Sequence, residues 1–389
     1  MSSGTVAVLL GPGTDPTRRG LVHPAPGRLA RLVDWIEGWA THLDVEARCE
    51  EVDASRCADR LAEVVADGVV VLAGDAAFDD PRVGAATATR AGPVVDLHLR
   101  DLTRRGPEPR TSFLARHGAR VMHGRGIDGA WWALHHLAWT LAWPSSTRTY
   151  GRHPEQVVEV REPDRAQRAG AGPVPDPDTA GADGPLSTVV LLHGGFWLAP
   201  WERDLMDGLA VDLAQRGART WNAEYRRIDT DGEWPGCGAD ALAVLTAADR
   251  ARGPGDPPVM VVGHSAGGQL ALWAAGQPTA PPLEAVIALA PLADLANAGD
   301  LGGGALERML AGADPGRACP TGAVPTEVPL TLVHGVDDDL VPVSQSRAYA
   351  TVARAAGAIV QLDERGDADH FSLVSPGAGW LDVFADTDR

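Results

Sequence analysis

The sequence predicts an α/β protein with two domains, each built on a parallel sheet. Short apolar runs alternate with helical patterns along nearly the whole chain, as in proteins whose parallel strands are joined by helices. The length of 389 residues exceeds that of one average domain. A Gly-x-Ser-x-Gly motif at 263–267 stands between an apolar run and a helical pattern, which is the strand–turn–helix context of a nucleophilic serine.

The first part of the chain, about 140 residues, has the size and pattern of one small α/β domain. Apolar runs predict strands and 3.6-residue periodicity predicts helices. The expected strands are 5–10, 45–52, 69–72, 94–99 and 120–123, and the expected helices are 27–43, 57–66, 81–90 and 127–143. This alternation predicts a doubly wound parallel sheet.

Four phrases of this domain resemble, in order, the sequence of type II 3-dehydroquinate dehydratase. They are VAVLLGPGTDPTRRG, GVVVLAGDAAFDD, VVDLHLRDLTRR and ARVMHGRGIDGAWWAL. The resemblance implies a flavodoxin-like fold. It also implies assembly into a homo-oligomer through this domain, because that family forms trimers and dodecamers.

The catalytic positions of that family are mostly replaced here. Where that family has a turn flanked by asparagines, this sequence has Leu10-Gly11-Pro12-Gly13, and the family's tyrosine is missing near Pro24. The position of its substrate-binding asparagine is occupied by Leu72, and that of its general-acid histidine by Phe78. The resemblance retains an arginine at 18 or 19, His98 and Arg105. Dehydration needs a base and an acid, so we expect residues 1–146 to be inactive and to serve assembly or ligand binding. His98 and Arg105 are candidates for binding a small carboxylate; the alternative is that they are a histidine at a strand end and an arginine on a loop with no binding role.

The second domain is expected at 147–389, after a junction at 144–149. A strand at 157–160 belongs to it, because YGRHPEQVVEVREP resembles the opening strand of an α/β-hydrolase. Residues 163–186 are rich in Gly, Ala, Pro and Asp without periodicity, which predicts a mobile surface loop.

The rest of this domain alternates buried strands with helices. Strands are expected at 189–192, 219–223, 259–262, 285–289, 330–333 and 358–362, and helices at 203–216, 239–252, 269–275, 305–311 and 348–356. The Gly/Pro-rich segment 293–327 follows a strand end, which favours a cap or acyl-pocket insertion.

Three residues in the required order form a candidate catalytic triad. Serine needs an imidazole base, and the imidazole needs a carboxylate to hold its tautomer. Ser265 is followed by Asp338 and then by His370, each at a strand end. Among three adjacent aspartates, Asp338 is the one that the hydrolase pattern H-G-x-x-D-x-x-V-P selects. His264 is expected to pack without acting as the base.

An oxyanion hole is expected from backbone N–H groups. One is that of Ala266, and the other is that of Gly195 or Phe196 in the sequence HGGFW. LLHGGFW, WNAEYRR, VGHSAGG, HGVDDDLVP and DHF together resemble the esterase/arylformamidase-like branch of the α/β-hydrolases. In WNAEYRR, Glu224 and Arg226 follow a strand end. We interpret them as part of a structural ion pair; the alternative is that they line the mouth of the pocket. Trp197 and Trp201 are candidates either for an acyl pocket or for the core.

Composition excludes several other classes of function. The net charge of −18 disfavours nucleic acids and anionic membranes as partners, and the absence of lysine excludes Schiff-base and Walker-type chemistry. The four cysteines are scattered, which indicates reduced thiols rather than a metal site. We see no export signal and no apolar run of membrane length, so a cytoplasmic location is expected.

The sequence therefore predicts a serine hydrolase that cleaves a small-molecule carboxylic ester through an acyl-enzyme, with no cofactor and no metal. The same machinery leaves three alternatives open: hydrolysis of an amide or N-formyl amide, hydrolysis of a thioester, and non-hydrolytic acyl transfer or cyclisation.

Overall fold

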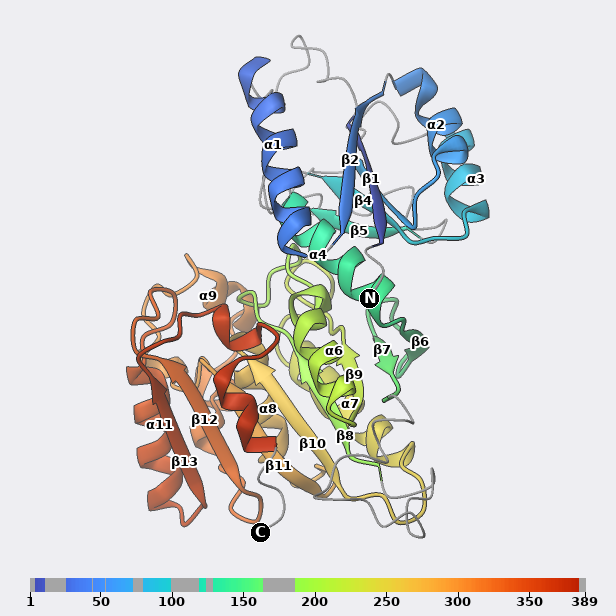
Figure 1. Cartoon of the computed structure of the whole chain (residues 1–389). Coiled ribbons are helices and arrows are strands. Elements are labelled where there is room, and N and C mark those ends of the chain that lie inside the picture. The colour runs from blue at the N-terminus through green and yellow to red at the C-terminus, as the bar shows by residue number, and fades with distance from the viewer. Residues whose placement is uncertain are drawn as a thin grey trace. The chain divides into compact units, whose positions relative to one another are not determined.

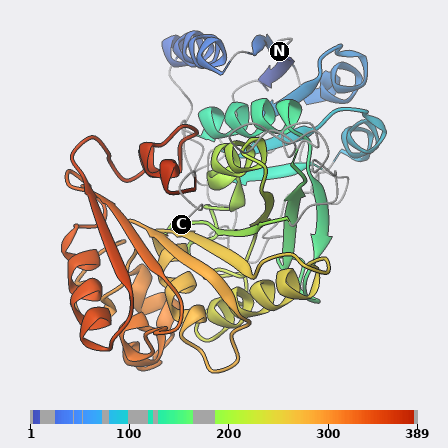
Figure 2. The same cartoon turned by 60° about the horizontal axis from the view of Figure 1, so that its bottom comes forward.

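The computed structural model describes residues 4–10, 26–43, 45–52, 54–72, 80–98, 119–123, 129–163 and 186–384. The chain separates into two units, Met1–Pro144 and Ser145–Arg389. Figures 1 and 2 show both units, and each is described by itself below. The expected loop at 163–186 falls almost wholly outside the described residues.

The first unit contains a five-stranded sheet in which every strand pair is parallel. Its strands are β1 (Thr5–Leu10), β2 (Glu46–Glu51), β3 (Gly68–Leu72), β4 (Val94–His98) and β5 (Arg120–His123). Their order in space is β2-β1-β3-β4-β5. This is the flavodoxin order, so the expected fold class is confirmed.

Helices cover both faces of this sheet (Figure 1). They are α1 (Pro26–His42), α2 (Cys57–Glu63, after a 3-10 turn at Ala54–Arg56), α3 (Pro81–Thr89) and α4 (Gly129–Ala142). Alternate residues of β1 face opposite sides: Val8 packs in the cluster with α1 and α4, and Leu9 in the cluster with α2 and α3. Asp80 caps α3, because its carboxylate accepts the N–H of Arg82 and Pro81 fits the first helical position.

The second unit contains an eight-stranded sheet with the strand order β6-β7-β9-β8-β10-β11-β12-β13. The strands are β6 (Ser146–Thr149), β7 (Val157–Arg161), β8 (Thr188–Leu192), β9 (Arg219–Ala223), β10 (Val259–His264), β11 (Leu283–Leu289), β12 (Leu330–Gly335) and β13 (Val360–Arg365). β7 is antiparallel to both its neighbours, and all other pairs are parallel. This arrangement is that of the α/β-hydrolase fold.

Two helical layers enclose the sheet. One contains α7 (Gly236–Arg250), α8 (Ala266–Ala275) and α11 (Ser344–Ala355). The other contains α6 (Asp207–Gln215) with the preceding 3-10 turn Arg203–Met206, and the 3-10 turns Ser372–Val374 and Gly379–Phe384. β10 contributes to both layers: Val261 packs toward α8 and Val262 toward α6.

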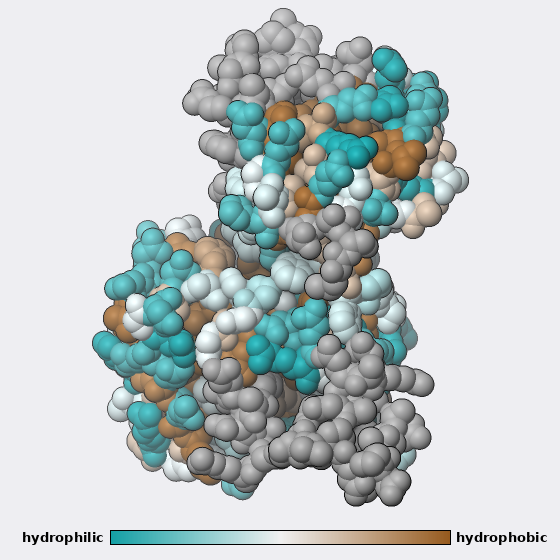
Figure 3. Space-filling model, in the orientation of Figure 1, coloured by the Kyte–Doolittle hydropathy of each residue, from teal (hydrophilic) through white to brown (hydrophobic). Residues whose placement is uncertain are grey.

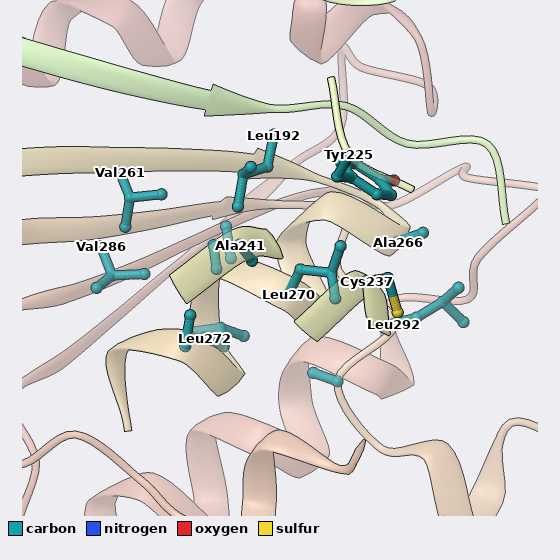
Figure 4. Packing of buried hydrophobic residues seen from close by; sticks show 14 of the residues in the cluster. Leu192, Tyr225, Cys237, Ala241, Val261, Ala266, Leu270, Leu272, Val286 and Leu292 are labelled. Carbon is teal, nitrogen blue, oxygen red and sulfur yellow. The ribbon is translucent and has the colours of Figure 1, made fainter. Parts of the chain in front are cut away.

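Helix α8, which directly follows Ser265, packs within the larger core cluster (Figure 4). Leu270 and Leu272 of α8 are fully buried in this cluster, together with Val261 of β10 and Val286 of β11. Because tight packing costs free energy to disturb, this burial holds the start of α8 in place relative to the strand ends.

The segment between β11 and β12 contains four short helical pieces. They are the 3-10 turn Leu295–Asn297, α9 (Ala305–Leu310), α10 (Pro315–Ala318) and the 3-10 turn Pro320–Gly322. These pieces occupy the expected insertion, and residues 293–327 are called the cap segment below.

The sequence-based expectations differ from the structure at a few positions. The junction expected at 144–149 is wrong in part, because Ser146–Thr149 forms strand β6 and pairs with β7 as part of the second unit. All four residues of β6 are exposed, so no apolar pattern marked the strand. α7 and α8 each begin three residues earlier than the apolar pattern indicated, since their first turns are rich in glycine.

No helix among the described residues has the length and apolarity needed to cross a membrane. On the face shown in Figure 3, hydrophilic residues are interspersed with apolar ones over both units.

Candidate active site

Ser265 occupies a strained turn between β10 and α8. Its φ of 55° and ψ of −117° are unusual for a residue with a side chain, and such backbone strain typically costs about 1–3 kcal/mol. Its N–H donates to the carbonyl of Leu289 on β11 at 2.8 Å, which fixes the turn to the sheet. The neighbouring glycines are required by space: a Cβ on Gly263 would collide with the carbonyl of Gly267, and a Cβ on Gly267 with that of Leu192.

The Ser265 side chain has no fixed partner in the described part of the chain. Its hydroxyl is buried and makes no hydrogen bond there, although buried polar groups are nearly always satisfied. The residue is only 1% exposed. The hydroxyl thus lies at the N-terminal end of α8 without a hydrogen bond to any described residue.

His370 and Asp338 are brought together as the sequence predicts. Nδ1 of His370 lies 2.7 Å from Oδ2 of Asp338, a short hydrogen bond between residues 32 positions apart. The imidazole of His370 also lies against that of His264, with ring centroids 4.6 Å apart. Among the described residues no hydrogen bond joins His370 to the Ser265 hydroxyl; unliganded sites often show this, and such contacts tighten when substrate binds.

The loop after β12 buries the side chain of only one of its three adjacent aspartates. The Asp338 side chain is fully buried, whereas Asp337 and Asp339 are exposed. Oδ1 of Asp338 accepts the N–H groups of Leu340 (2.9 Å) and Val341 (2.8 Å). Burial by itself raises the pKa of the Asp338 carboxyl, but hydrogen bonds from histidines outweigh it, so the pKa lies below its ordinary value.

His264 contacts the backbone of His370. Its Nε2–H donates to the carbonyl oxygen of His370 at 2.9 Å, and in the described residues its Nδ1 has no partner. Complete burial and the nearby His370 hold the pKa of His264 well below its ordinary value. The His264 ring is therefore neutral and acts as a hydrogen-bond donor to the main chain of His370.

The segment after β8, residues 193–201, lies against the turn at Ser265. Because it contains the expected oxyanion-hole residues Gly195 and Phe196, it is called the oxyanion loop below. A Cβ on Gly194 would lie 2.9 Å from the Cβ of Ser265. Gly195, Phe196 and Trp197 have φ values of 105°, 52° and 56°, and two of these three residues are not glycine. The N–H of Leu198 donates to the carbonyl of Gly195 at 3.0 Å, so Phe196 and Trp197 are the two central residues of a tight turn.

The loop's aromatic residues differ in their surroundings. Trp197 is 1% exposed and donates its Nε1–H to Gln269 on α8 at 3.1 Å, which places it in the core; of the two sequence-based interpretations, the core one is favoured. Trp201 is half-buried and stacks on Phe371, with ring centroids 6.2 Å apart. Phe371, beside the base, is 37% exposed and was not singled out from the sequence.

The sequence-based candidates of the first unit are only partly described. His98 ends β4, is buried, and pairs with Asp96 at 2.9 Å; His123 is its neighbour on β5. Arg105 lies outside the described residues, as do Phe78 and the turn after Leu10. The described residues contain no cluster of three or more His, Cys, Asp or Glu side chains suited to a metal ion.

Comparison with solved structures finds distant likenesses that cover about 60% of this chain. No family model and no curated protein matches the sequence. Thermogutta terrifontis esterase 2 in its apo form is 22% identical with a TM-score of 0.47, covering 60% of this chain and 87% of that chain. A truncated carbohydrate esterase from gut microbiota is 15% identical with a TM-score of 0.49, covering 62% and 95%. At these identities the likeness concerns the fold alone.

Proposed function

We propose that the second unit is a serine hydrolase that cleaves small carboxylic esters through an acyl-enzyme. The observation that carries the proposal is the 2.7 Å contact between His370 and Asp338, together with the strained, unsatisfied Ser265, whose chain neighbour His264 donates to the His370 carbonyl at 2.9 Å. These residues have the chain order and the strand-end positions of an acyl-transfer triad.

In the proposed reaction the Ser265 hydroxyl oxygen attacks the ester carbonyl carbon. Its proton passes to Nε2 of His370, while Asp338 accepts the hydrogen bond from Nδ1–H and stabilises the imidazolium. The negative carbonyl oxygen is received by the N–H of Ala266 and by that of Gly195 or Phe196. The C–O bond then breaks, and His370 returns the proton to the leaving alcohol.

Water completes the cycle. It attacks the acyl carbon while His370 takes its proton, and the second tetrahedral intermediate then collapses to the carboxylic acid as His370 returns that proton to the departing Ser265 oxygen. Each step uses only the chain's own residues and water, so the proposal requires no cofactor.

The substrate class is proposed from the aromatic residues beside the base. Trp201 and Phe371 stack on each other, and Phe371 also contacts His370 with ring centroids 5.3 Å apart. Aromatic side chains bind apolar groups by burying large areas. Esters of short apolar acids therefore fit this site better than charged ones.

The test compares serine substitutions in the purified full chain. We expect the wild type to hydrolyse p-nitrophenyl acetate and to react with a fluorophosphonate probe, and Ser265→Ala to lose both. Ser146→Ala, on the exposed strand β6, is the matched control and keeps both activities. Undiminished labelling of the Ser265→Ala protein would overturn the assignment.

For the first unit we propose assembly or ligand binding without dehydratase chemistry. The proposal is supported by the replaced catalytic positions at Leu72 and Phe78. Light scattering of the full chain tests assembly: a mass several times that of one chain supports it, and a monomeric mass contradicts it.

A further inference from the structure

A buried group of charges lies directly behind the oxyanion loop, on residues that the proposed reaction does not use. Its centre is Glu224, which follows β9 and whose side chain is 3% exposed. β8 and β9 are neighbours in register, with Leu192 opposite Ala223, so the residues after the two strands, His193 and Glu224, meet. The sheet topology thus brings a carboxylate to the root of the loop.

Both oxygens of Glu224 are engaged. Oε1 lies 2.9 Å from Nε2 of His193, the first residue of the loop, and 3.3 Å from Nε of Arg227. Oε2 accepts the backbone N–H of Arg203 at 3.0 Å, just beyond the loop's end. One carboxylate therefore connects the two ends of the loop.

Arg227 holds the second half of the loop. Its guanidinium, also buried, donates from Nη1 to the carbonyl of Ala199 (2.8 Å) and to that of Trp201 (2.6 Å). Nη2 donates to Glu155 at 2.7 Å. The planar, forked guanidinium can bind several oxygens in fixed directions, so these contacts define where the loop's main chain lies.

The loop needs such support, because its conformation is not one that the chain adopts unaided. Phe196 and Trp197 have positive φ values, and residues in such conformations persist only where the surrounding structure holds them. The Tyr225 hydroxyl adds a further hydrogen bond to the carbonyl of His193 at 2.8 Å, and the two rings stack 4.3 Å apart.

A contribution to stability does not by itself explain these charges, since replacing a buried ion pair with apolar residues is often neutral or stabilising. Burial by itself raises the pKa of Glu224, but the Arg227 guanidinium and the hydrogen bond to His193 outweigh it and keep the pKa below its ordinary value. The carboxylate is thus ionised, and its charge is directed at groups that belong to the loop or flank it.

We propose that Glu224 and Arg227 are positioning residues that hold the oxyanion loop in the shape needed to bind the transition-state oxyanion. They act through His193 and through the carbonyls of Ala199 and Trp201, without touching the substrate. This inference rests on the proposed function, because it assigns these residues to the same hydrolytic site.

The test uses Glu224→Gln, which keeps size but removes the charge. Loss of a whole oxyanion donor lowers kcat by about 10²–10³-fold, and a displaced loop should cost less. We expect kcat to fall roughly 10- to 100-fold with KM changed less than about threefold. The affinity for a trifluoromethyl ketone, which mimics the tetrahedral intermediate, should weaken in proportion to kcat.

Asp240→Asn is the matched control. Asp240 is equally buried and is held by the neighbouring Arg226 at 2.7 Å, and its side-chain hydrogen bonds among the described residues go to Gln156 and Arg226, outside the oxyanion loop. We expect it to lower the melting temperature while kcat stays within about threefold of wild type. If Glu224→Gln fails to fold, Arg227→Lys serves instead, because it keeps the charge but not the fork to both carbonyls.

Hydrogen exchange of residues 194–201 in the full chain separates this inference from the proposed function. Faster exchange in the Glu224 variant but not in the Asp240 variant supports positioning, even if no ester is cleaved by the wild type. Unchanged exchange and unchanged kcat in the Glu224 variant would overturn it. Equal losses of kcat in both variants, following their loss of stability, would overturn it as well.

Discussion

Replacing Asp338 by asparagine is the most informative single change in the catalytic constellation. Oδ1 of Asp338 accepts two backbone N–H groups, from Leu340 and Val341, and therefore must remain an oxygen in the variant. The amide nitrogen of the new side chain then takes the place of Oδ2, 2.7 Å from Nδ1 of His370. Because an amide N–H₂ only donates, Nδ1 must become the acceptor and the ring proton moves to Nε2.

The wrong tautomer removes the base. A protonated, neutral Nε2 cannot accept the serine proton, and such a substitution in a serine protease triad lowers kcat by about 10⁴. At about 1.36 kcal/mol per tenfold, this corresponds to about 5.4 kcal/mol of transition-state stabilisation. The stability cost is smaller, about 1.5–3 kcal/mol for one hydrogen bond to a charged group.

The assay is kcat/KM for p-nitrophenyl acetate, with the melting temperature measured on the same samples. Asp337→Asn is the matched control, since Asp337 is adjacent but exposed, and we expect its kcat to stay within about twofold of wild type. The tautomer explanation fails if the Asp338 variant retains more than a tenth of the activity, or if the Asp337 variant loses as much.

Three further predictions follow from the same contacts. His264→Phe removes the N–H that the His370 carbonyl accepts, so kcat should fall about fivefold, the equivalent of one hydrogen bond of ~1 kcal/mol. His264→Gln, which restores a donor, should recover part of this loss, and equal kcat in all three proteins contradicts the prediction. The pKa values of Asp338 and Glu224 are lowered by folding, so their stabilisation is complete above about pH 4 and is lost as the pH falls below it. Urea unfolding from pH 7 to pH 3 should show this loss, with a shallower pH dependence in Asp338→Asn; a parallel dependence speaks against it. Finally, the chain should not convert 3-dehydroquinate to its enone product, measured by ultraviolet absorbance with an active type II dehydratase as control, and normal turnover would show that the first unit keeps its chemistry despite Phe78.

Much of the fold could be predicted from local patterns of apolar residues. Apolar runs predicted the buried strands β1, β3, β8, β10 and β11, because buried strands of parallel sheets are almost wholly apolar. The half-exposed β13, with the sequence VQLDER, begins two residues and ends three residues later than its apolar residues indicated. β6 was missed for the opposite reason: Ser146–Thr149 is an exposed edge whose residues carry no hydrophobic signal. The 3-10 start of the helix at Arg203–Met206 was also not visible in the spacing of its apolar residues.

The triad residues could be chosen from the sequence because each follows a strand and stands in a recognisable motif. The choice of Asp338 over its neighbours needed a family pattern, and the structure adds the physical reason that only this carboxylate is turned inward to His370. The partner of Glu224 could not be found in this way. Its contact with His193 depends on β8 and β9 lying side by side, a property of sheet topology rather than of local sequence.

If Ser265 carries the acyl group, the acyl-enzyme can be trapped and located in the chain. The full chain is mixed with an excess of p-nitrophenyl trimethylacetate, quenched in acid within the pre-steady-state phase, digested and mapped by mass spectrometry. We predict one trimethylacetyl adduct, on the peptide that contains Ser265, together with a burst of p-nitrophenol close to one equivalent per chain. An adduct on any other residue, or a burst that persists in Ser265→Ala, would contradict the role given to Ser265.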